Sequence, residues 1–258
     1  MMDTMKNATF TSESSHSSAV GFGHEREQIH RNMLSAVAHD LKTPLASIIG
    51  SLDVYTAMQG RLTAEKQAEL IKVALQEAHR LDHFITNILD MARLEEGVVK
   101  PKQERVNIGA MLANCLASMG AQLQGATVDI QGLPETVTSV SDTVLLSRAA
   151  SIVLDNAIKY GGAPVASQVE YGNGDTGSGY IRIHDNGVGI ASDQVENIFS
   201  KYTRLERIGQ KKISGAGLGL AIARHIMQLL HGDIVAANHA SGGAVFTLRF
   251  PLEVATSG

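Results

Sequence analysis

Residues 34–55, LSAVAHDLKTPLASIIGSLDVY, repeat apolar side chains at steps of three and four. The positions that keep this step are Leu34, Val37, Leu41, Leu45, Ile48, Leu52 and Tyr55. Such a repeat is the stripe of a coiled-coil helix. It predicts one long helix that runs from Glu25 to about Met58.

A second stripe of the same kind follows after a short break. Gly60 interrupts the first pattern, Thr63 is a suitable N-cap, and Gly97 and Pro101 end the second helix. The second stripe contains Ile71, Ala74, Ala78, Leu81, Ile85, Ile88 and Ala92. Two helices of about 30 residues, each some 45 to 50 Å long, predict an antiparallel α-helical hairpin.

A single hairpin cannot cover both apolar stripes, so we expect two copies to pair into a dimeric four-helix bundle. This predicts a homodimer that forms through a domain at residues 24–98. Residues 1–23 are polar and serine-rich, and they predict a disordered tail.

The pattern changes after Pro101, where short β-type runs alternate with helical stretches. The β-type runs are Thr127–Ile130, Thr136–Val140, Val165–Tyr171, Tyr180–His184, Asp233–Ala237 and Ala244–Phe250, and the helical stretches are Ile108–Met119, Asp142–Tyr160 and Leu218–Leu230. Mostly antiparallel strands packed on helices predict an α+β sandwich. We expect a linker at 99–103, this second domain at 104–252 and a tail at 253–258.

The composition excludes several functional classes. The chain has 258 residues, a formal net charge of −4 and one cysteine, Cys115. This charge offers no bulk basic field for nucleic acid, and one cysteine excludes an internal disulfide framework. No stretch approaches the roughly 18 apolar residues that a membrane span needs. We therefore expect a soluble, cytoplasmic chain without a nucleic-acid partner.

His39 is suited to nucleophilic chemistry. At about 100° per residue it points roughly 200° away from the core positions Val37 and Leu41, which predicts an exposed imidazole. Pro44 has no N–H for the carbonyl of Asp40, so the turn beside the histidine is bent or loosened. A carboxylate or carbonyl on one ring nitrogen leaves the other with a reactive lone pair near neutral pH.

The residues that follow on the His39 side of this helix are all small: Thr43, Ala46 and Gly50. One interpretation is that another helix packs closely there. The other is that a partner protein brings its backbone close to the imidazole. The pattern alone leaves both open.

Two glycine-rich stretches predict a nucleotide site. Residues 185–189, DNGVG, follow a strand, and residues 215–220, GAGLGL, open a helix. Backbone N–H groups and a helix dipole suit phosphates, and Asp185 can accept from an exocyclic amine. The spacing matches neither the Walker pattern nor the dinucleotide fingerprint.

Two further features accompany these stretches. Residues 203–214, rich in arginine and lysine, predict a mobile basic lid or a solvated loop. Asn156 and Tyr160 share one face of the expected helix at 142–160. An amide oxygen is a hard ligand suited to Mg²⁺, and the tyrosine ring can lie against a base.

Five motifs in this order make residues 24–252 resemble the sensor histidine kinases of two-component signalling. AHDLKTPL (38–45) looks like the H-box, LDNAIKYG (154–161) like the N-box, DNGVGI (185–190) like the first glycine box, IFSKY (198–202) like the F-box and GAGLGL (215–220) like the second glycine box. EREQ (25–28) and ILDMARLE (88–95) are similar to the potassium-sensing subgroup.

The resemblance implies a histidine kinase/Hsp90-like ATP-binding fold for the second domain. It also implies ATP-dependent autophosphorylation of His39 and transfer of the phosphoryl group to an aspartate of a response-regulator receiver domain, with phosphatase activity toward that receiver as a further expectation. Asp40 would orient or deprotonate His39, and Thr43 would serve dephosphorylation.

A set of nucleotide contacts is implied as well. Asn156 would hold Mg²⁺, and Asp155 would assist as a base. The other expected ATP contacts are Lys159, Tyr160, Asp185, Gly187, Gly189, Arg204, Gly215, Gly217, Leu218, Gly219 and Thr247.

One position departs from the family pattern. Ile152 stands one turn before Asn156, where the N-box usually carries a second asparagine. This keeps an alternative open, a catalytically weak nucleotide-binding scaffold or regulator with the same fold. An ATPase of chaperone or topoisomerase type would share the glycine boxes but lack the H-box, and the negative charge disfavours a DNA-binding regulator.

Overall fold

The structure is a computed structural model that describes residues 37–58, 60–120, 123, 126–132, 137–161, 165–173, 177–203 and 217–252. The chain divides into two compact units between Asp82 and His83. The expected tails at 1–23 and 253–258, and the expected start of the first helix at Glu25, lie outside the described residues.

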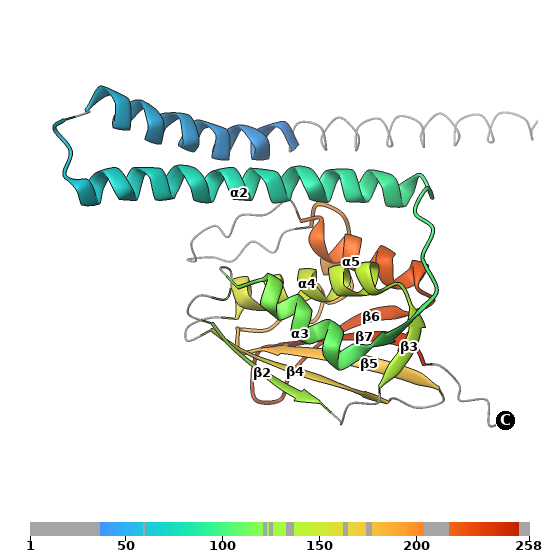
Figure 1. Cartoon of the computed structure of the whole chain (residues 1–258). Coiled ribbons are helices and arrows are strands. Elements are labelled where there is room, and N and C mark those ends of the chain that lie inside the picture. Colours follow the sequence, from blue (N-terminus) through green and yellow to red (C-terminus); the bar gives the residue numbers. More distant parts are fainter. Residues whose placement is uncertain are drawn as a thin grey trace, which may run out of the picture. The chain divides into compact units, whose positions relative to one another are not determined.

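The first unit is the expected helical hairpin (Figure 1). Residues 37–57 are helical, and helix α2 (Ala64–Glu95) follows after a short turn in which Gly60 has a φ of 85°. The hydroxyl of Thr63 accepts from the N–H of Lys66 at 3.4 Å, as expected of an N-cap. The helix over 37–57 stays continuous through Pro44, whose side chain is buried.

The second unit has two layers, with helices α3, α4 and α5 on one face of a five-stranded sheet (Figure 1). Its helices are α3 (Ile108–Ser118), α4 (Thr143–Tyr160), the short η1 (Asn197–Phe199) and α5 (Gly219–Leu229). Its strands are β1 (Glu104–Asn107), β2 (Ala126–Gly132), β3 (Thr138–Ser141), β4 (Val165–Asn173), β5 (Ser178–Asp185), β6 (Asp233–Asn238) and β7 (Ala244–Pro251).

The sheet topology agrees with the expected α+β sandwich. The large sheet has the order β2-β4-β5-β7-β6, and β1 pairs with β3 in a separate two-stranded sheet. Only the pairing of β2 with β4 is parallel among these strands. Every second residue of β5 and β7 is buried, which places Ile183 and Phe246 toward the helices and leaves the other face of the sheet to solvent.

The end of helix α2 belongs to the second unit. Met91 and Leu94 are buried in the same hydrophobic core as α4 and the sheet. Nη2 of Arg148 on α4 donates to Oδ1 of Asn87 at 2.9 Å and to Oδ2 of Asp90 at 3.0 Å. The ammonium group of Lys201 in the F-box pairs with Glu95. Residues 83–95 of the helix are therefore fastened to the domain that follows them.

The segment expected as a linker, residues 99–103, is also fastened. Val99 packs against the core, and the N–H of Lys102 donates to Oδ2 of Asp142 at 2.8 Å. This hydrogen bond would have to break before residues 99–103 could act as a hinge. The boundary between the two compact units instead falls inside helix α2.

Asp142 links this segment to the helix that carries the N-box. It is the N-cap of α4, where its Oδ1 accepts from the N–H groups of Val144 and Leu145, both at 3.0 Å. The carboxylate is buried and therefore shielded from water. One side chain thus satisfies two helix N–H groups and the N–H of Lys102.

We predict that Asp142→Ala destabilises the second unit by about 1–2 kcal/mol, because three backbone N–H groups lose their acceptor and α4 loses its N-cap. Urea unfolding followed by circular dichroism measures this change. Asp142→Asn keeps a cap oxygen and should lose less than half as much. A loss in Asp142→Ala no larger than that in Asp142→Asn would contradict the assigned role.

Candidate functional site

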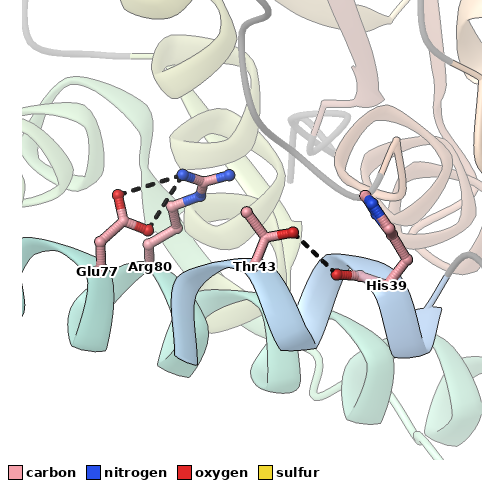
Figure 2. Close-up of polar contacts among 4 residues, drawn as sticks. All are labelled: His39, Thr43, Glu77 and Arg80. Atoms are coloured by element: carbon pink, nitrogen blue, oxygen red, sulfur yellow. Dashed lines mark hydrogen bonds and ion pairs between the residues drawn. The ribbon is translucent and has the colours of Figure 1, made fainter. Parts of the chain in front are cut away.

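His39 lies on the first helix with its side chain 73% exposed. Its Nδ1 is 3.2 Å from Oδ1 of Asp40. The hydroxyl of Thr43 donates to the backbone carbonyl of His39 at 3.1 Å (Figure 2). A hydrogen bond from Nδ1–H to the carboxylate fixes the tautomer in which Nε2 carries the lone pair. The exposed ring is then a nucleophile accessible from solvent.

The helix face beside His39 is open within the described residues of the first unit. Thr43, Ala46 and Gly50 are all exposed, and no heavy atom lies within 4 Å of the position that a Cβ of Gly50 would take. On α2, Nη1 of Arg80 donates to both carboxylate oxygens of Glu77, at 3.2 and 3.3 Å (Figure 2).

In the second unit, the N-box meets the second glycine box where α5 begins. A Cβ at Gly219 would lie 3.2 Å from Cγ2 of Ile152 and 3.9 Å from Nδ2 of Asn156. The N-terminus of α5, with its unsatisfied N–H groups, therefore faces the side chain expected to hold Mg²⁺. This pairing of a helix N-terminus with an amide suits a metal-bound phosphate.

The C-terminal end of the N-box meets the first glycine box. A Cβ at Gly187 would lie 2.4 Å from the carbonyl oxygen of Tyr160 and 2.9 Å from Oδ1 of Asp185. A Cβ at Gly161 would lie 3.6 Å from Cβ of Asp185. The two glycines thus let the end of α4 and the loop after β5 approach closely, and Tyr160 is exposed beside them.

Asp185 is the buried charged group of this site, with 4% of its surface exposed. Its Oδ1 accepts from the N–H of Gly187 at 2.8 Å and from the N–H of Ala244 at 3.1 Å. Its Oδ2 has no hydrogen-bond partner among the described residues. This arrangement holds one carboxylate oxygen rigidly and leaves the other for a donor such as an exocyclic amine.

Asp155 and Lys159 form an ion pair with each other on the exposed side of α4. Both side chains are more than a third exposed, so the pair contributes little to stability. Lys159 would have to leave Asp155 in order to contact a phosphate.

The F-box contacts the second glycine box directly. The N–H of Tyr202 donates to the carbonyl of Gly217 at 2.9 Å, and a Cβ at Gly217 would lie 2.6 Å from the carbonyl oxygen of Thr203. Burial, and then the carboxylate of Glu95, raises the pKa of Tyr202 above its ordinary value. The expected basic lid beyond Thr203, with Arg204, lies outside the described residues, as does Gly215 of the second glycine box.

The side chains of two expected ATP contacts, Thr247 and Leu218, do not point into this site. Thr247 pairs across β7 with Arg182 and Val235, on the face of the sheet opposite to that of Asp185. The period of two in a strand explains this difference, because residues 246 and 248 take the inward positions. The side chain of Leu218 is buried in the core.

Three contacts come from a turn that the motifs did not include. Asn238, Gly243 and Ala244 border the β6–β7 turn, and all three touch the first glycine box or Asp185. The pair Gly242-Gly243 between two expected strands was the available signal, because consecutive glycines often mark a tight approach of two backbones.

The donor set fits Mg²⁺ bound mainly through phosphates. Asn156 offers one amide oxygen, and Mg²⁺ usually takes one or two protein oxygens and completes its shell with phosphates and water. Among the described residues no group of three His, Cys, Asp or Glu could hold a metal by itself. In the same part of the chain, no helix has the length and apolarity to cross a membrane.

Two family models match the chain in the order that the motifs suggest. The model described as His Kinase A (phospho-acceptor) domain matches residues 29–97. The model described as histidine kinase-, DNA gyrase B- and HSP90-like ATPase matches residues 141–254.

Curated relatives are similar along most of this chain. Sensor protein KdpD of Escherichia coli strain K12 is 32% identical over 238 residues, which are 90% of this chain and 25% of that protein. Signal transduction histidine-protein kinase AfsQ2 of Streptomyces coelicolor is 27% identical over 236 residues, 88% of this chain and 42% of that protein. The chain thus spans about a quarter of KdpD and less than half of AfsQ2.

Solved structures share the fold. Histidine kinase ThkA in complex with response regulator protein TrrA matches 95% of this chain and 68% of that chain, with a TM-score of 0.66 and 19% identity. Acinetobacter baumannii histidine kinase AdeS matches 84% of this chain and 98% of that chain, with a TM-score of 0.64 and 21% identity.

We predict that Gly187→Ala lowers the affinity for MgADP about tenfold or more, because its methyl group would collide with the backbone carbonyl of Tyr160. Isothermal titration calorimetry measures the affinity. Gly120→Ala is the matched control, since its Cβ meets only the carbonyl oxygen of Ala117 at 3.4 Å and should leave binding within twofold. Equal affinities of the two variants would contradict this geometry.

Proposed function

Because the chain belongs to the two-component sensor histidine kinases, as its successive phospho-acceptor and ATPase domains show, we propose that it phosphorylates His39 with ATP. The phosphoryl group then passes to an aspartate of a response-regulator receiver domain. The observation that carries this proposal is the exposed imidazole of His39, hydrogen-bonded to Asp40, in one chain with a nucleotide cradle.

In the proposed reaction, Nε2 of His39 attacks the γ-phosphorus of ATP. A P–N bond forms as the bond to the bridging oxygen breaks, and ADP leaves with the electron pair. Asp40 holds Nδ1–H and stabilises the positive charge that develops on the ring. Positioning and charge neutralisation supply most of the catalysis, as in other phosphoryl transfers.

The cradle in the second unit binds and orients the nucleotide. Asp185 accepts from the adenine amine, Tyr160 lies against the base, and the N-terminus of α5 at Gly219 receives phosphate oxygens. Asn156 would hold Mg²⁺, which neutralises the charge of the phosphates. Asp155, freed from Lys159, would assist as a base, and Lys159 would then contact a phosphate.

The proposed transfer requires the nucleotide to travel to His39. The contacts of Arg148 with Asp90 and of Lys201 with Glu95 restrict a swing at residues 99–103. We therefore expect the motion either to break these ion pairs or to bend helix α2 near the unit boundary at Asp82. Since the reaction consumes ATP, we place it in the cytoplasm.

A receiver domain is the proposed partner of the first unit. The small, exposed side chains of Thr43 and Ala46 and the open surface at Gly50 let another backbone approach the imidazole. The similarity to ThkA, whose structure was solved with a response regulator protein, supports a partner of this class. Thr43 would also serve dephosphorylation of the receiver, after its hydroxyl leaves the carbonyl of His39.

Homodimerisation is proposed from the distribution of apolar residues on the first unit. Within each predicted stripe, some residues are covered inside the hairpin, such as Ala74, and others are open. The large open side chains in this unit include Leu45, Ile49, Leu52, Ile71 and Leu75. They form a face that a second copy would cover as a four-helix bundle.

One observation favours the alternative, a catalytically weak scaffold or regulator. Ile152 fills the space beside Gly219 with a methyl group where the family usually has an amide. The site then has one polar ligand fewer for Mg²⁺ or phosphate.

Incubation with γ-labelled ATP and Mg²⁺ tests the proposed activity. We expect a label on the chain that is labile in acid and stable in alkali, that is absent from His39→Gln, and that moves to an added receiver domain. His79→Gln, on the exposed side of α2, is the matched control and should keep the label. Nucleotide binding without any label on His39 would favour the scaffold instead.

We predict that Leu75→Glu shifts the chain from dimer to monomer. The leucine side chain is 56% exposed in the single chain and would be buried in the proposed bundle, so the substitution would bury a charge there. Light scattering after size exclusion measures the mass. Gln76→Glu adds the same charge at the neighbouring position, which is not one of these exposed apolar side chains, and should stay dimeric. A monomeric unaltered chain at micromolar concentration would refute the dimer.

A further inference from the structure

The β6–β7 turn holds the first glycine box through one side chain. Oδ1 of Asn238 accepts from the N–H of Ile190 at 2.7 Å, and its Nδ2 donates to the carbonyl of the same residue at 2.7 Å. The amide thus pairs with Ile190 as a neighbouring β-strand would. Both backbone groups of the last residue in the box depend on it.

This side chain also explains why residue 189 is glycine. Gly189 has a φ of 75°, and a Cβ there would lie 2.7 Å from Oδ1 of Asn238 and 3.3 Å from the carbonyl oxygen of Gly243. The backbone of the box therefore lies directly against the turn, with no room for a side chain between them.

The same turn holds the other end of the box. The N–H of Ala244 donates to Oδ1 of Asp185, and a Cβ at Gly243 would lie only 1.7 Å from the carbonyl oxygen of Asp185. His184 donates from Nε2 to the carbonyl of Gly242 at 3.1 Å. The loop from Asp185 to Ile190 is thus fixed at both ends by residues that belong to none of the five motifs.

We infer that Asn238 is a positioning residue for the nucleotide site. By holding Gly189 and Ile190, it keeps the loop that carries Gly187 in the conformation that receives the nucleotide. The inference rests on the proposed nucleotide-binding function, and it adds a residue that touches the loop and not the nucleotide.

The chemistry of the amide accounts for its role. Asparagine offers a donor and an acceptor at the spacing of a backbone N–H and carbonyl, and it needs no charge. Aspartate would keep the acceptor but set a carboxylate oxygen against the carbonyl of Ile190. Alanine would leave the N–H and the carbonyl of Ile190 without this partner.

The test compares Asn238→Ala and Asn238→Asp with the unaltered full chain by titration with MgADP. Each variant should raise the dissociation constant roughly tenfold, since two hydrogen bonds to the loop are lost or opposed. Asn114→Ala, at an exposed position on α3, is the matched control and should stay within twofold.

Kinetics separate positioning from simple loss of folded protein. In Asn238→Ala the ATP concentration that half-saturates labelling of His39 should rise roughly tenfold, while the rate at saturating ATP stays within about twofold. A lower maximal rate with an unchanged half-saturating concentration would overturn the inference, as would an MgADP affinity equal to that of Asn114→Ala.

If the variants fail to fold, hydrogen exchange of the unaltered chain tests whether Asn238 holds Ile190. The amide of Ile190 in the unaltered chain without nucleotide should exchange at least a hundredfold more slowly than in an unstructured peptide. Exchange at the peptide rate would overturn the inference. An unaltered chain that binds no MgADP would overturn the proposed function and this inference together, whereas equal binding by all variants would overturn this inference alone.

Discussion

The nucleotide cradle depends on the buried carboxylate of Asp185. Its Oδ1 gathers the N–H groups of Gly187 and Ala244, which come from the loop after β5 and from the start of β7. The end of α4 packs against the same side chain at Gly161. A buried charge is tolerated only where such donors surround it, so the three segments are arranged around one acceptor. Gly187 and Gly243 have no room for a side chain, because their backbones lie directly against these segments.

Much of the architecture could be predicted from local patterns. The steps of three and four gave the hairpin because helix periodicity needs only neighbours in sequence. The short β-type runs at Tyr180–His184 and Ala244–Phe250 predicted β5 and β7 for the same reason. The closeness of Asn156 to Gly219 and of Tyr160 to Gly187 was expected only through the family resemblance, since residues so far apart in sequence meet through tertiary packing.

The sequence failed where tertiary contacts determine a residue's surroundings. Thr247 was expected near the adenine, but the register of β7 turns it to the other face of the sheet. Asn238 has no sequence signal for its role, because nothing local reveals that Ile190 lies opposite its amide. The attachment of Arg148 to Asn87 and Asp90 joins segments about 60 residues apart and has no local signature.

Helix α2 runs without a break for 32 residues, and its last turns are built into the core of the second unit at Met91 and Leu94. Asn87, Asp90, Met91 and Leu94 thus reach α4 and the core from successive turns of one helix. Each residue turns a helix by about 100°, so inserting one residue between Asp90 and Met91 would rotate the partners of Arg148 by that amount relative to the buried Met91 and Leu94. The number of residues in this part of the helix is therefore constrained by packing, as well as their identity.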